Sequence, residues 1–342
     1  MAETSQSPDA TQPTAETFVN AAPGIVADDD FSVYDETAQS DTTSITSSVL
    51  DYQYENGRRY DAYSQGRYIM PNDDTEQKRL DIAHHVFLLL FKGELYTAPI
   101  NENPQAILDL GTGTGIWAID MADKFPSARV IGNDLSAIQP SWVPPNLEFV
   151  IDDFEKTWMY ERDYFDYIHA RTISGCVQNW PQLLQQALEH LRPGGYFEAV
   201  EHTAWAWSDD GTLKDDSPYM QYIRWLNEAS EKSGRRINIA PELKQWMIDA
   251  GFEDVTEKVY MVPLGPWPKD PKLKEVGKWE YILAPESVEA YGLRLYTQVL
   301  GWSSDEAKIH HALVRQQLRD RTVHAYVKLY AVYGRKPGPK AT

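Results

Sequence analysis

Apolar residues in the middle of the chain form short runs separated by segments with helical spacing. The runs are of the kind that buried parallel strands show, and they predict strands at 106–110, 128–132, 147–151, 165–170 and 196–200. Apolar residues three and four positions apart predict helices at 116–124 and 181–191. Strands that alternate with helices predict a parallel, doubly wound α/β sheet whose ligand site lies at the carboxyl ends of the strands.

The last third of the chain departs from this alternation. Its patterns predict helices at 218–232, 241–250, 273–283, 288–300 and 304–319, and strands at 255–262 and 325–333. A proline-rich stretch at 266–271 must be a loop. We therefore expect a segment of helical insertions and closing strands over 205–335, followed by a short tail at 336–342.

The first fifty residues have no apolar periodicity. They are rich in Ser, Thr, Ala and Asp, and they contain nine acidic residues but no lysine or arginine. Such a segment cannot bury enough apolar surface to offset the entropy of ordering it, so we expect residues 1–50 to form a disordered acidic tail.

Residues 51–100 are expected to form a helical lid or cap. Five tyrosines and three arginines lie within 52–68, a composition too polar for a core and too aromatic for a free linker. A helix should follow, capped near Asp74 or Thr75, with Leu80 and Phe87 on one face. The alternative to a mobile lid is a helix packed permanently on the sheet.

The first predicted strand runs into three alternating glycines, in the sequence A-I-L-D-L-G-T-G-T-G over 106–115. Glycine allows positive φ and lets a ligand approach the backbone, and the following helix offers free N–H groups. A phosphate-binding P-loop would need a Gly-Lys-Ser/Thr sequence, and a dinucleotide fingerprint would place the third glycine one residue later. The spacing therefore disfavours a dinucleotide oxidoreductase.

Acidic residues follow the next two predicted strands. Asp134 comes nineteen residues after Gly115, where its carboxylate can accept hydrogen bonds from both hydroxyls of a ribose. Asp152, Asp153 and Phe154 follow the third predicted strand.

Composition narrows the class of partner. The net charge of −19 opposes the phosphate backbone of DNA or RNA, so no direct nucleic-acid contact is expected. The single cysteine, Cys176, fits a reducing compartment, and no apolar run is long enough to span a membrane. With no secretory signal, the chain is expected to be intracellular, in the cytoplasm or alternatively the nucleus.

Five features in order resemble the class I S-adenosylmethionine (SAM) methyltransferases. They are the glycine loop, the acid after the second strand, D-D-F after the third, F-D-Y-I-H-A-R at the fourth, and L-R-P-G-G before the fifth. The resemblance implies a seven-stranded Rossmann-like sheet with a reversed last hairpin, a SAM-binding core over 101–204, and S-adenosylhomocysteine (SAH) as product.

More narrowly, Y-E-N-G-R-R-Y, P-N-D-D-T-E and I-S-G-C-V-Q-N-W resemble the fungal LaeA-like methyltransferases, from about Tyr52 to Tyr333. That family contains enzymes that methylate small natural products and regulators of secondary metabolism that bind velvet-domain proteins. The resemblance therefore implies a small-molecule acceptor, with a regulator acting through velvet-type partners as the alternative.

The resemblance also assigns roles around the glycine loop. Gly111 and Gly113 would admit SAM to the backbone, and Gly115 would allow close strand–helix packing. Asp109 suits the ammonium of the methionine moiety, and Asp134 suits the ribose. Asp152 or Asp153 would accept a hydrogen bond from the adenine amino group, with Phe154 against the face of the ring.

Further cofactor candidates lie on other segments. His169 would lie beside the sulfonium, and Arg171 would pair with the methionine carboxylate. Tyr60, in the tyrosine-rich cover, is a further candidate.

His202 and Glu201 end the fifth strand and are the candidate catalytic residues. An unperturbed histidine pKa suits removal of a proton from a hydroxyl near neutral pH, with Glu201 tuning His202. Aromatic residues are expected to wall the acceptor site: Trp205, Trp207, Tyr219, Tyr222 and Trp225. The alternative is that His202 only bonds a main-chain carbonyl.

Overall fold

The computed structural model describes residue 19 and residues 52–61 and 70–338. Apart from Val19, the predicted tail over 1–50 lies outside the described residues, as do residues 62–69 of the tyrosine-rich segment and residues 339–342 of the predicted C-terminal tail.

A seven-stranded sheet in the order β5-β4-β3-β6-β7-β9-β8 forms the centre of the molecule. The first five strands of that order are parallel, and β9 is antiparallel to both of its neighbours. This order confirms the predicted Rossmann-like sheet with a reversed last hairpin. The strands are β3 (Ala106–Leu110), β4 (Arg129–Asp134), β5 (Leu147–Ile151), β6 (Phe165–Arg171), β7 (Leu191–His202), β8 (Glu253–Pro263) and β9 (Tyr326–Arg335).

The fifth parallel strand is longer than predicted. The L-R-P-G-G stretch, expected to be a turn before residue 196, lies within β7, which pairs with β6 from Leu191 onward through an irregularity between Phe165 and Tyr167. The register shift absorbs the extra residues, so the strand continues where a proline and two glycines suggested a break.

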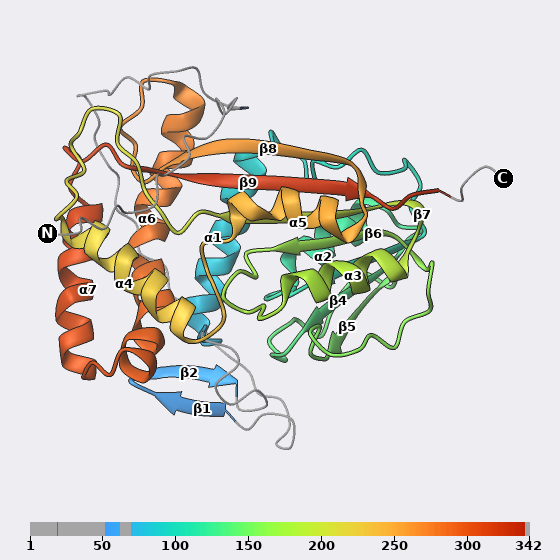
Figure 1. The fold of residues 1–342 in the computed structure, drawn as a ribbon, viewed down its shortest axis with the longest axis horizontal. Helices are drawn as coiled ribbons and strands as arrows, with labels where there is room; N and C mark the ends of the chain where they lie inside the picture. Colours follow the sequence, from blue (N-terminus) through green and yellow to red (C-terminus); the bar gives the residue numbers. More distant parts are fainter. Residues whose placement is uncertain (1–18, 20–51, 62–69, 339–342) are drawn as a thin grey trace, which may run out of the picture.

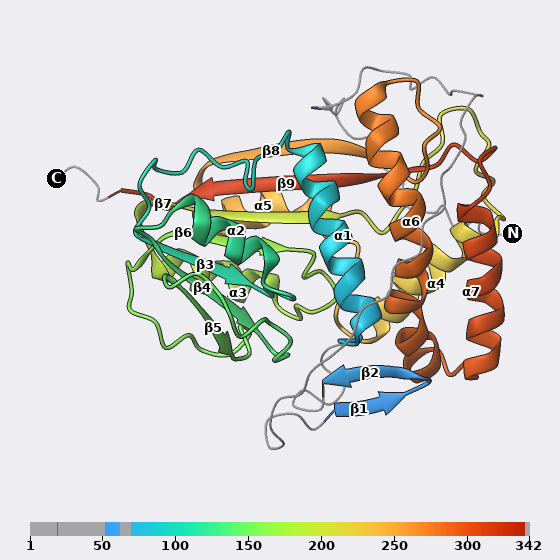
Figure 2. The same cartoon turned by 180° about the vertical axis from the view of Figure 1, so that it is seen from behind.

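Helices cover both faces of the sheet (Figures 1 and 2). On one face, α2 packs on β4 and β5, and α1 crosses toward the end of the sheet. On the other face, α3 and α5 pack together. These helices are α1 (Asp74–Leu90), α2 (Ile116–Lys124), α3 (Trp180–His190) and α5 (Leu243–Ala250), the last preceded by the 3₁₀ turn η1 (Ala240–Glu242).

A group of helices lies beyond the carboxyl ends of the parallel strands (Figure 1). It consists of α4 (Pro218–Lys232), α6 (Pro271–Arg294), the π-helical segment η2 (Leu295–Val299) and α7 (Ser304–Leu318). Their buried residues share one core with α1 and with the ends of β7, β8 and β9. This group therefore covers the edge of the sheet where the ligand site is expected.

Helix α6 is continuous where the sequence predicts two helices, at 273–283 and 288–300. Pro285 lies inside it and removes one backbone hydrogen bond, at a cost of about 3 kcal/mol or more. Leu283 and Val288, on either side of the proline, are both buried in the same core. Tertiary packing of α6 therefore outweighs the tendency of Pro285 to break the helix.

The segment expected to be a helical lid begins instead with a β-hairpin of β1 (Tyr52–Glu55) and β2 (Arg58–Asp61). Its turn residues, Asn56 and Gly57, have φ of 54° and 88°. Positive φ at both central positions is the type I′ turn that the Asn-Gly pair favours. The prediction of a helical cap was wrong for residues 52–61, although this signal was in the sequence.

Ion pairs fix the hairpin to the helices that follow. Arg58 Nε donates to Asp73 Oδ2 at 2.6 Å, and Asp73 is the N-cap residue of α1. Glu55 lies 3.4 Å from Arg294 Nε and accepts a hydrogen bond from Gln298. The hairpin thus joins α1 to the far end of α6.

Candidate functional site

Two hollows lie side by side at the carboxyl ends of the parallel strands. The first, the glycine-loop crevice, lies over β3, β4 and β6, and the second, the inner cavity, lies under α1, α4 and α6. The crevice brings together six of the residues that the sequence singled out: Gly111, Gly113, Asp134, Asp153, Phe154 and Arg171.

The glycine loop requires glycine at its first two positions. Gly111 and Gly113 have φ of 67° and 59°, which L side chains rarely adopt. A Cβ at Gly111 would lie 2.6 Å from Ile173 Cγ2, and one at Gly113 would lie 3.3 Å from Leu80 Cδ1. The bare backbone of both residues therefore lines the crevice.

Gly115 has a different position. A Cβ there would lie 2.3 Å from Phe149 Cζ on β5, so this glycine allows α2 to pack closely on the sheet. It does not line the crevice, and a direct contact between Gly115 and the cofactor stays a prediction.

Asp134 ends β4 with its carboxylate turned to the glycine loop. Its Oδ2 accepts from Gly113 N at 2.8 Å and its Oδ1 accepts from Ser136 N at 2.9 Å. Burial raises the pKa of Asp134 to about 6. Each oxygen keeps a further lone pair, so the carboxylate suits a ligand that donates two hydrogen bonds.

Asp109 and His169 lie beneath the loop, with exposed fractions of 3% and 1%. Asp109 accepts from His169 Nδ1 at 2.7 Å and from Thr112 Oγ1 at 2.7 Å. The His169 ring stacks on Trp117, with 3.8 Å between centroids. This geometry supports the loop from below, and the proposed contacts of these two residues with the methionine moiety stay predictions.

Arg171 lies in the crevice with its guanidinium 4.4 Å from the Phe87 ring centroid and Nη2 3.1 Å from His84 Nδ1. Within residues 52–61 and 70–338, no carboxylate forms an ion pair with it. Burial lowers the pKa of Arg171 to about 10, which still leaves it charged at neutral pH. A half-buried cation without an anionic partner suits a carboxylate ligand.

The remaining cofactor candidates differ in position. Phe154 lines the crevice and is buried, as is Asp153, whereas Asp152 is exposed and does not line it. Tyr60 lies away from the crevice, with its ring buried against the Arg294 guanidinium at 4.6 Å. Cofactor contacts of Asp152 and Tyr60 stay predictions.

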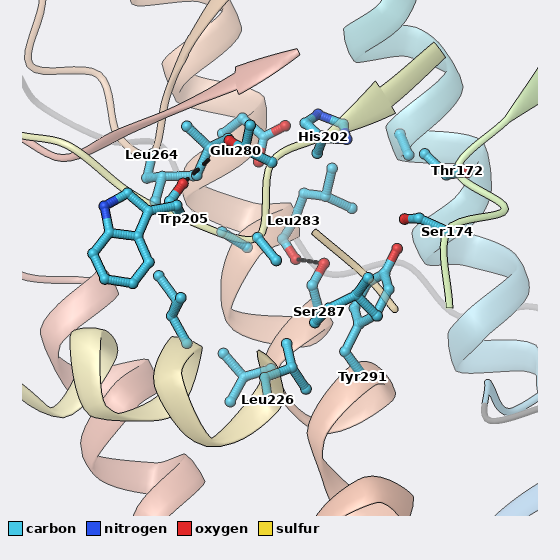
Figure 3. A pocket seen from close by; sticks show the side chains of 18 of the residues that line it. Thr172, Ser174, His202, Trp205, Leu226, Leu264, Glu280, Leu283, Ser287 and Tyr291 are labelled. Atoms are coloured by element: carbon cyan, nitrogen blue, oxygen red, sulfur yellow. Dashed lines mark hydrogen bonds between the residues drawn. The ribbon is translucent and has the colours of Figure 1, made fainter. Parts of the chain in front are cut away.

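The inner cavity has a volume of about 170 Å³ and a mostly apolar lining (Figure 3). Its charged and hydroxyl-bearing side chains come from α1, α4, α6, β7 and the loop after β6. They include Glu201 and His202, as the sequence predicts, and also Ser174, Glu280 and Ser287.

Glu201 is fully buried at the end of β7. Its Oε1 accepts from Ile173 N at 2.7 Å and from Ser174 N at 3.1 Å, while Oε2 has no hydrogen-bond partner among the described residues. Burial raises the pKa of Glu201 to about 7. This carboxyl group can therefore hold or release a proton near neutral pH.

His202 faces the cavity, with its ring 5.6 Å from the Phe87 ring. Burial, followed by the charges of Arg79 and Arg171, lowers the pKa of His202 to about 4, so the expectation of an unperturbed pKa was wrong. In the part of the chain that the structure describes, no hydrogen bond joins its ring to Glu201 or to a main-chain carbonyl. A neutral ring facing the cavity can accept a hydrogen bond from a ligand.

The aromatic wall forms only in part. Trp205, Tyr219 and Tyr222 line the cavity. Trp207 instead pairs with Tyr326 in an isolated bridge, and Trp225 packs against Trp302 with 4.7 Å between ring centroids.

Sequence reasoning missed Glu280 and Leu80 as lining residues. Glu280 is 5% exposed and lies on the face of α6 that carries Leu283 and Ala284. A lone carboxylate at helical spacing on an apolar face was the available signal. Leu80 was placed on the apolar face of α1, but no sequence pattern indicates that it reaches both hollows.

Comparison with known proteins relates the chain to methyltransferases. A family model described as a methyltransferase domain matches residues 82–257. Methyltransferase pytC of Aspergillus terreus is 44% identical over 299 residues, which are 87% of this chain and 92% of that protein. Secondary metabolism regulator LAE1 of Cochliobolus heterostrophus is 39% identical over 290 residues, 83% of this chain and 94% of that protein.

Solved structures give weaker similarities. A phosphoethanolamine N-methyltransferase 2 of Haemonchus contortus has a TM-score of 0.45 at 15% identity, covering 82% of this chain and 62% of that chain. YcgJ of Bacillus subtilis has a TM-score of 0.44 at 18% identity, covering 75% of this chain and 100% of that chain. At these scores the similarity supports no conclusion, and the fold class rests on the order of the strands. Among the described residues, no helix is both long and apolar enough to cross a membrane.

Proposed function

The chain belongs to the methyltransferase-domain family and is a SAM-dependent methyltransferase, and on this premise we propose that it methylates a small secondary metabolite held in the inner cavity. The glycine-loop crevice is the proposed SAM site. The observation that carries the proposal is that this crevice and the inner cavity share Leu80 and Thr172 as lining residues.

The residues of the crevice fit SAM. Asp134 offers lone pairs to the two ribose hydroxyls, and Arg171 offers a half-buried cation to the methionine carboxylate. Phe154 and Asp153 suit the adenine ring and its amino group. When bound, SAM supplies a methyl group carried on a positively charged sulfur, and this sulfur is the leaving group, which becomes the neutral thioether of SAH.

The protein then contributes mainly position and exclusion of water. The apolar lining of the inner cavity excludes solvent and holds the acceptor beside the shared wall. Correct placement of two reactants can lower a barrier by roughly 7–11 kcal/mol. Because the methyl donor is already activated, no covalent enzyme intermediate is required.

We propose that His202 orients the acceptor. In addition, its ring can remove the proton of the acceptor hydroxyl that is methylated. At neutral pH its ring is neutral and accepts a hydrogen bond from an acceptor hydroxyl. The low pKa of His202 makes its ring a weak base. The pKa of about 7 makes Glu201 the stronger base and the better final acceptor of the proton. In the described part of the chain no hydrogen bond joins the two side chains, so Glu201 would take up a proton from the acceptor and not from His202.

Two measurements test this proposal. The purified chain should bind SAM and SAH in calorimetry, and absence of binding to both would refute the proposed cofactor site. His202→Ala, assayed with an identified acceptor at saturating SAM, should lose about 10²–10⁴-fold in rate if the ring removes a proton. A loss below about tenfold, with SAH affinity unchanged, would leave His202 a scaffold residue.

The second candidate function is regulation through a velvet-type protein partner. It is favoured by the 39% identity to LAE1 and by 37% identity over 298 residues to secondary metabolism regulator laeA of Aspergillus flavus. Purification from the native host discriminates between the two functions. A regulator should co-purify with a partner protein in stoichiometric amount, whereas an enzyme that methylates small molecules should purify without one.

A further inference from the structure

Glu280 lies in the middle of α6, on the side facing the inner cavity (Figure 3). Leu283, Ala284, Ser287 and Tyr291 follow it at helical spacing and line the same cavity. Its exposed fraction is 5%, so the carboxyl group is buried among the residues that would surround an acceptor.

No hydrogen bond or ion pair to the Glu280 side chain is present in the described ranges, 52–61 and 70–338. The other carboxyl groups nearby are engaged. Glu76 binds Arg79 through both oxygens, at 2.6 and 2.9 Å. Glu201 accepts from two backbone N–H groups through Oε1 and leaves only Oε2 without a partner among the described residues. An unpaired buried polar group destabilises a fold, so its presence in a cavity points to a ligand that pairs with it.

The charges that face Glu280 favour a particular ligand class. Burial raises the pKa of Glu280 to about 8, and burial also favours the neutral forms of Glu201 and His202. Arg79, the cation that faces this cavity, is engaged with Glu76. An anionic acceptor would meet two carboxyl groups and no unengaged positive charge.

Resting on the proposed function, we propose that Glu280 is a specificity-determining residue of the inner cavity, which selects a neutral or cationic aromatic acceptor by bonding a hydroxyl or amino group. Glu280 lies on α6, whereas Leu80 of α1 and Thr172 form the wall that the cavity shares with the crevice, so Glu280 binds a group of the acceptor other than the atom that is methylated. The carboxyl group accepts a hydrogen bond from that donor in either protonation state.

Three probes of matched shape test this selection without any methyl transfer: 2-naphthol, 2-methoxynaphthalene and 2-naphthoate. Their affinities for the full chain, measured through quenching of tryptophan fluorescence, should differ. We expect 2-naphthol to bind about tenfold tighter than 2-methoxynaphthalene, since only the former donates a hydrogen bond. We expect 2-naphthoate to bind more weakly than 2-naphthol.

Variants test whether the Glu280 side chain causes the difference in affinity between the probes. Glu280→Leu should bring the ratio of the 2-naphthol and 2-methoxynaphthalene affinities close to one, whereas Glu280→Gln should keep most of it. Glu286→Gln, at an exposed position of the same helix, is the matched control and should leave the ratio unchanged. Circular dichroism and SAH binding on the same samples report whether each variant is folded.

Several outcomes would overturn the proposal: no binding of any probe, equal binding of 2-naphthoate and 2-naphthol, or an unchanged ratio in Glu280→Leu. These outcomes are separable from failure of the proposed function. Loss of SAH binding or of methyl transfer, with probe discrimination intact, would count against the methyltransferase assignment of the two hollows and not against Glu280.

Discussion

Leu80 of α1 and Thr172, the residue after β6, line both the glycine-loop crevice and the inner cavity. Thr172 holds a φ of 54°, and its N donates to Val200 O at 3.0 Å. A β-branched residue in the left-handed region is strained, and such strain is concentrated at functional sites. This wall is therefore where a methyl donor and an acceptor would meet.

Leu80→Ala should lower the methyl-transfer rate more than it lowers SAM affinity. Truncating the side chain enlarges the opening between the two hollows and loosens the alignment of the methyl donor with the acceptor. Misplacement by about 1 Å can cost about 10²-fold in rate. Single-turnover kinetics at saturating SAM measure the effect. Leu88→Ala, on the same helix but away from both hollows, is the control. Equal losses in rate and affinity would show that Leu80 only supports SAM binding.

SAH affinity should depend on pH through Asp134. Two donated hydrogen bonds favour the ionised carboxylate, whose pKa in the free protein is about 6. Binding must then expel a proton at low pH, so we expect about tenfold weaker binding at pH 5 than at pH 7.5. Calorimetry at both pH values measures this.

Asp134→Asn should lack the pH dependence, and the exposed Asp152→Asn should keep it. Asp134→Ala should weaken SAM binding by roughly 1.5–3 kcal/mol, the range for hydrogen bonds to a charged group. Identical pH profiles in the wild type and Asp134→Asn would place the ribose contact elsewhere.

Glu201 should make the protein less stable as the pH rises. Its pKa of about 7 lies above the ordinary value of 4.5, so between these pH values the folded state binds more protons than the unfolded state. The free energy of unfolding therefore falls over that window, by at most about 3 kcal/mol, and stays low above it. Urea unfolding at pH 5 and pH 8 should show a smaller fall in Glu201→Gln, and an equal fall in both proteins would contradict the assignment.

His311 should make the protein sensitive to acid. Its ring is fully buried between Tyr222 and Tyr296, and neither ring nitrogen has a hydrogen-bond partner among the described residues. Burial, together with the charges of Arg315 and His310, lowers its pKa to about 3. Below pH 6.5 the unfolded state binds the extra proton, so stability is lost as the pH falls.

The expected contribution of His311 is about 2 kcal/mol between pH 7 and pH 5. Urea unfolding of His311→Leu should lose less stability over this range than the wild type. The exposed His85→Leu should behave like the wild type. A His311→Leu variant with the same acid sensitivity as the wild type would contradict this explanation.

The crevice could be predicted because its chemistry is local in sequence. Gly111 and Gly113 follow a buried strand directly, and Asp134 ends the next strand, so adjacency in the sheet brings them together. Arg171 and Phe154 follow from the same rule at the ends of β6 and β5.

The sequence predicted the part of the inner cavity formed by β7, the loop after it and α4, but not the part formed by α1 and α6, because these helices come from distant parts of the chain. No sequence pattern places Glu280 opposite β7, or Leu80 at the wall between the hollows. The low pKa of His202 likewise depends on burial by these helices and on the charges of Arg79 and Arg171. The hairpin at Asn56 and Gly57 is a different case, since its turn signal was present in the sequence.

Transfer of a radiolabelled methyl group from SAM to organic-soluble metabolites of the native host tests the central claim most directly. Wild-type protein should form labelled product. Gly113→Val should lose both product and SAH binding, because a β-branched residue is strained at a φ of 59° and its side chain would enter the crevice. Ala284→Trp should lose product but keep SAH binding, because the larger side chain fills only the inner cavity. Product that persists in Ala284→Trp, or SAM binding without any product in the wild type, would contradict methylation of a small molecule in this cavity.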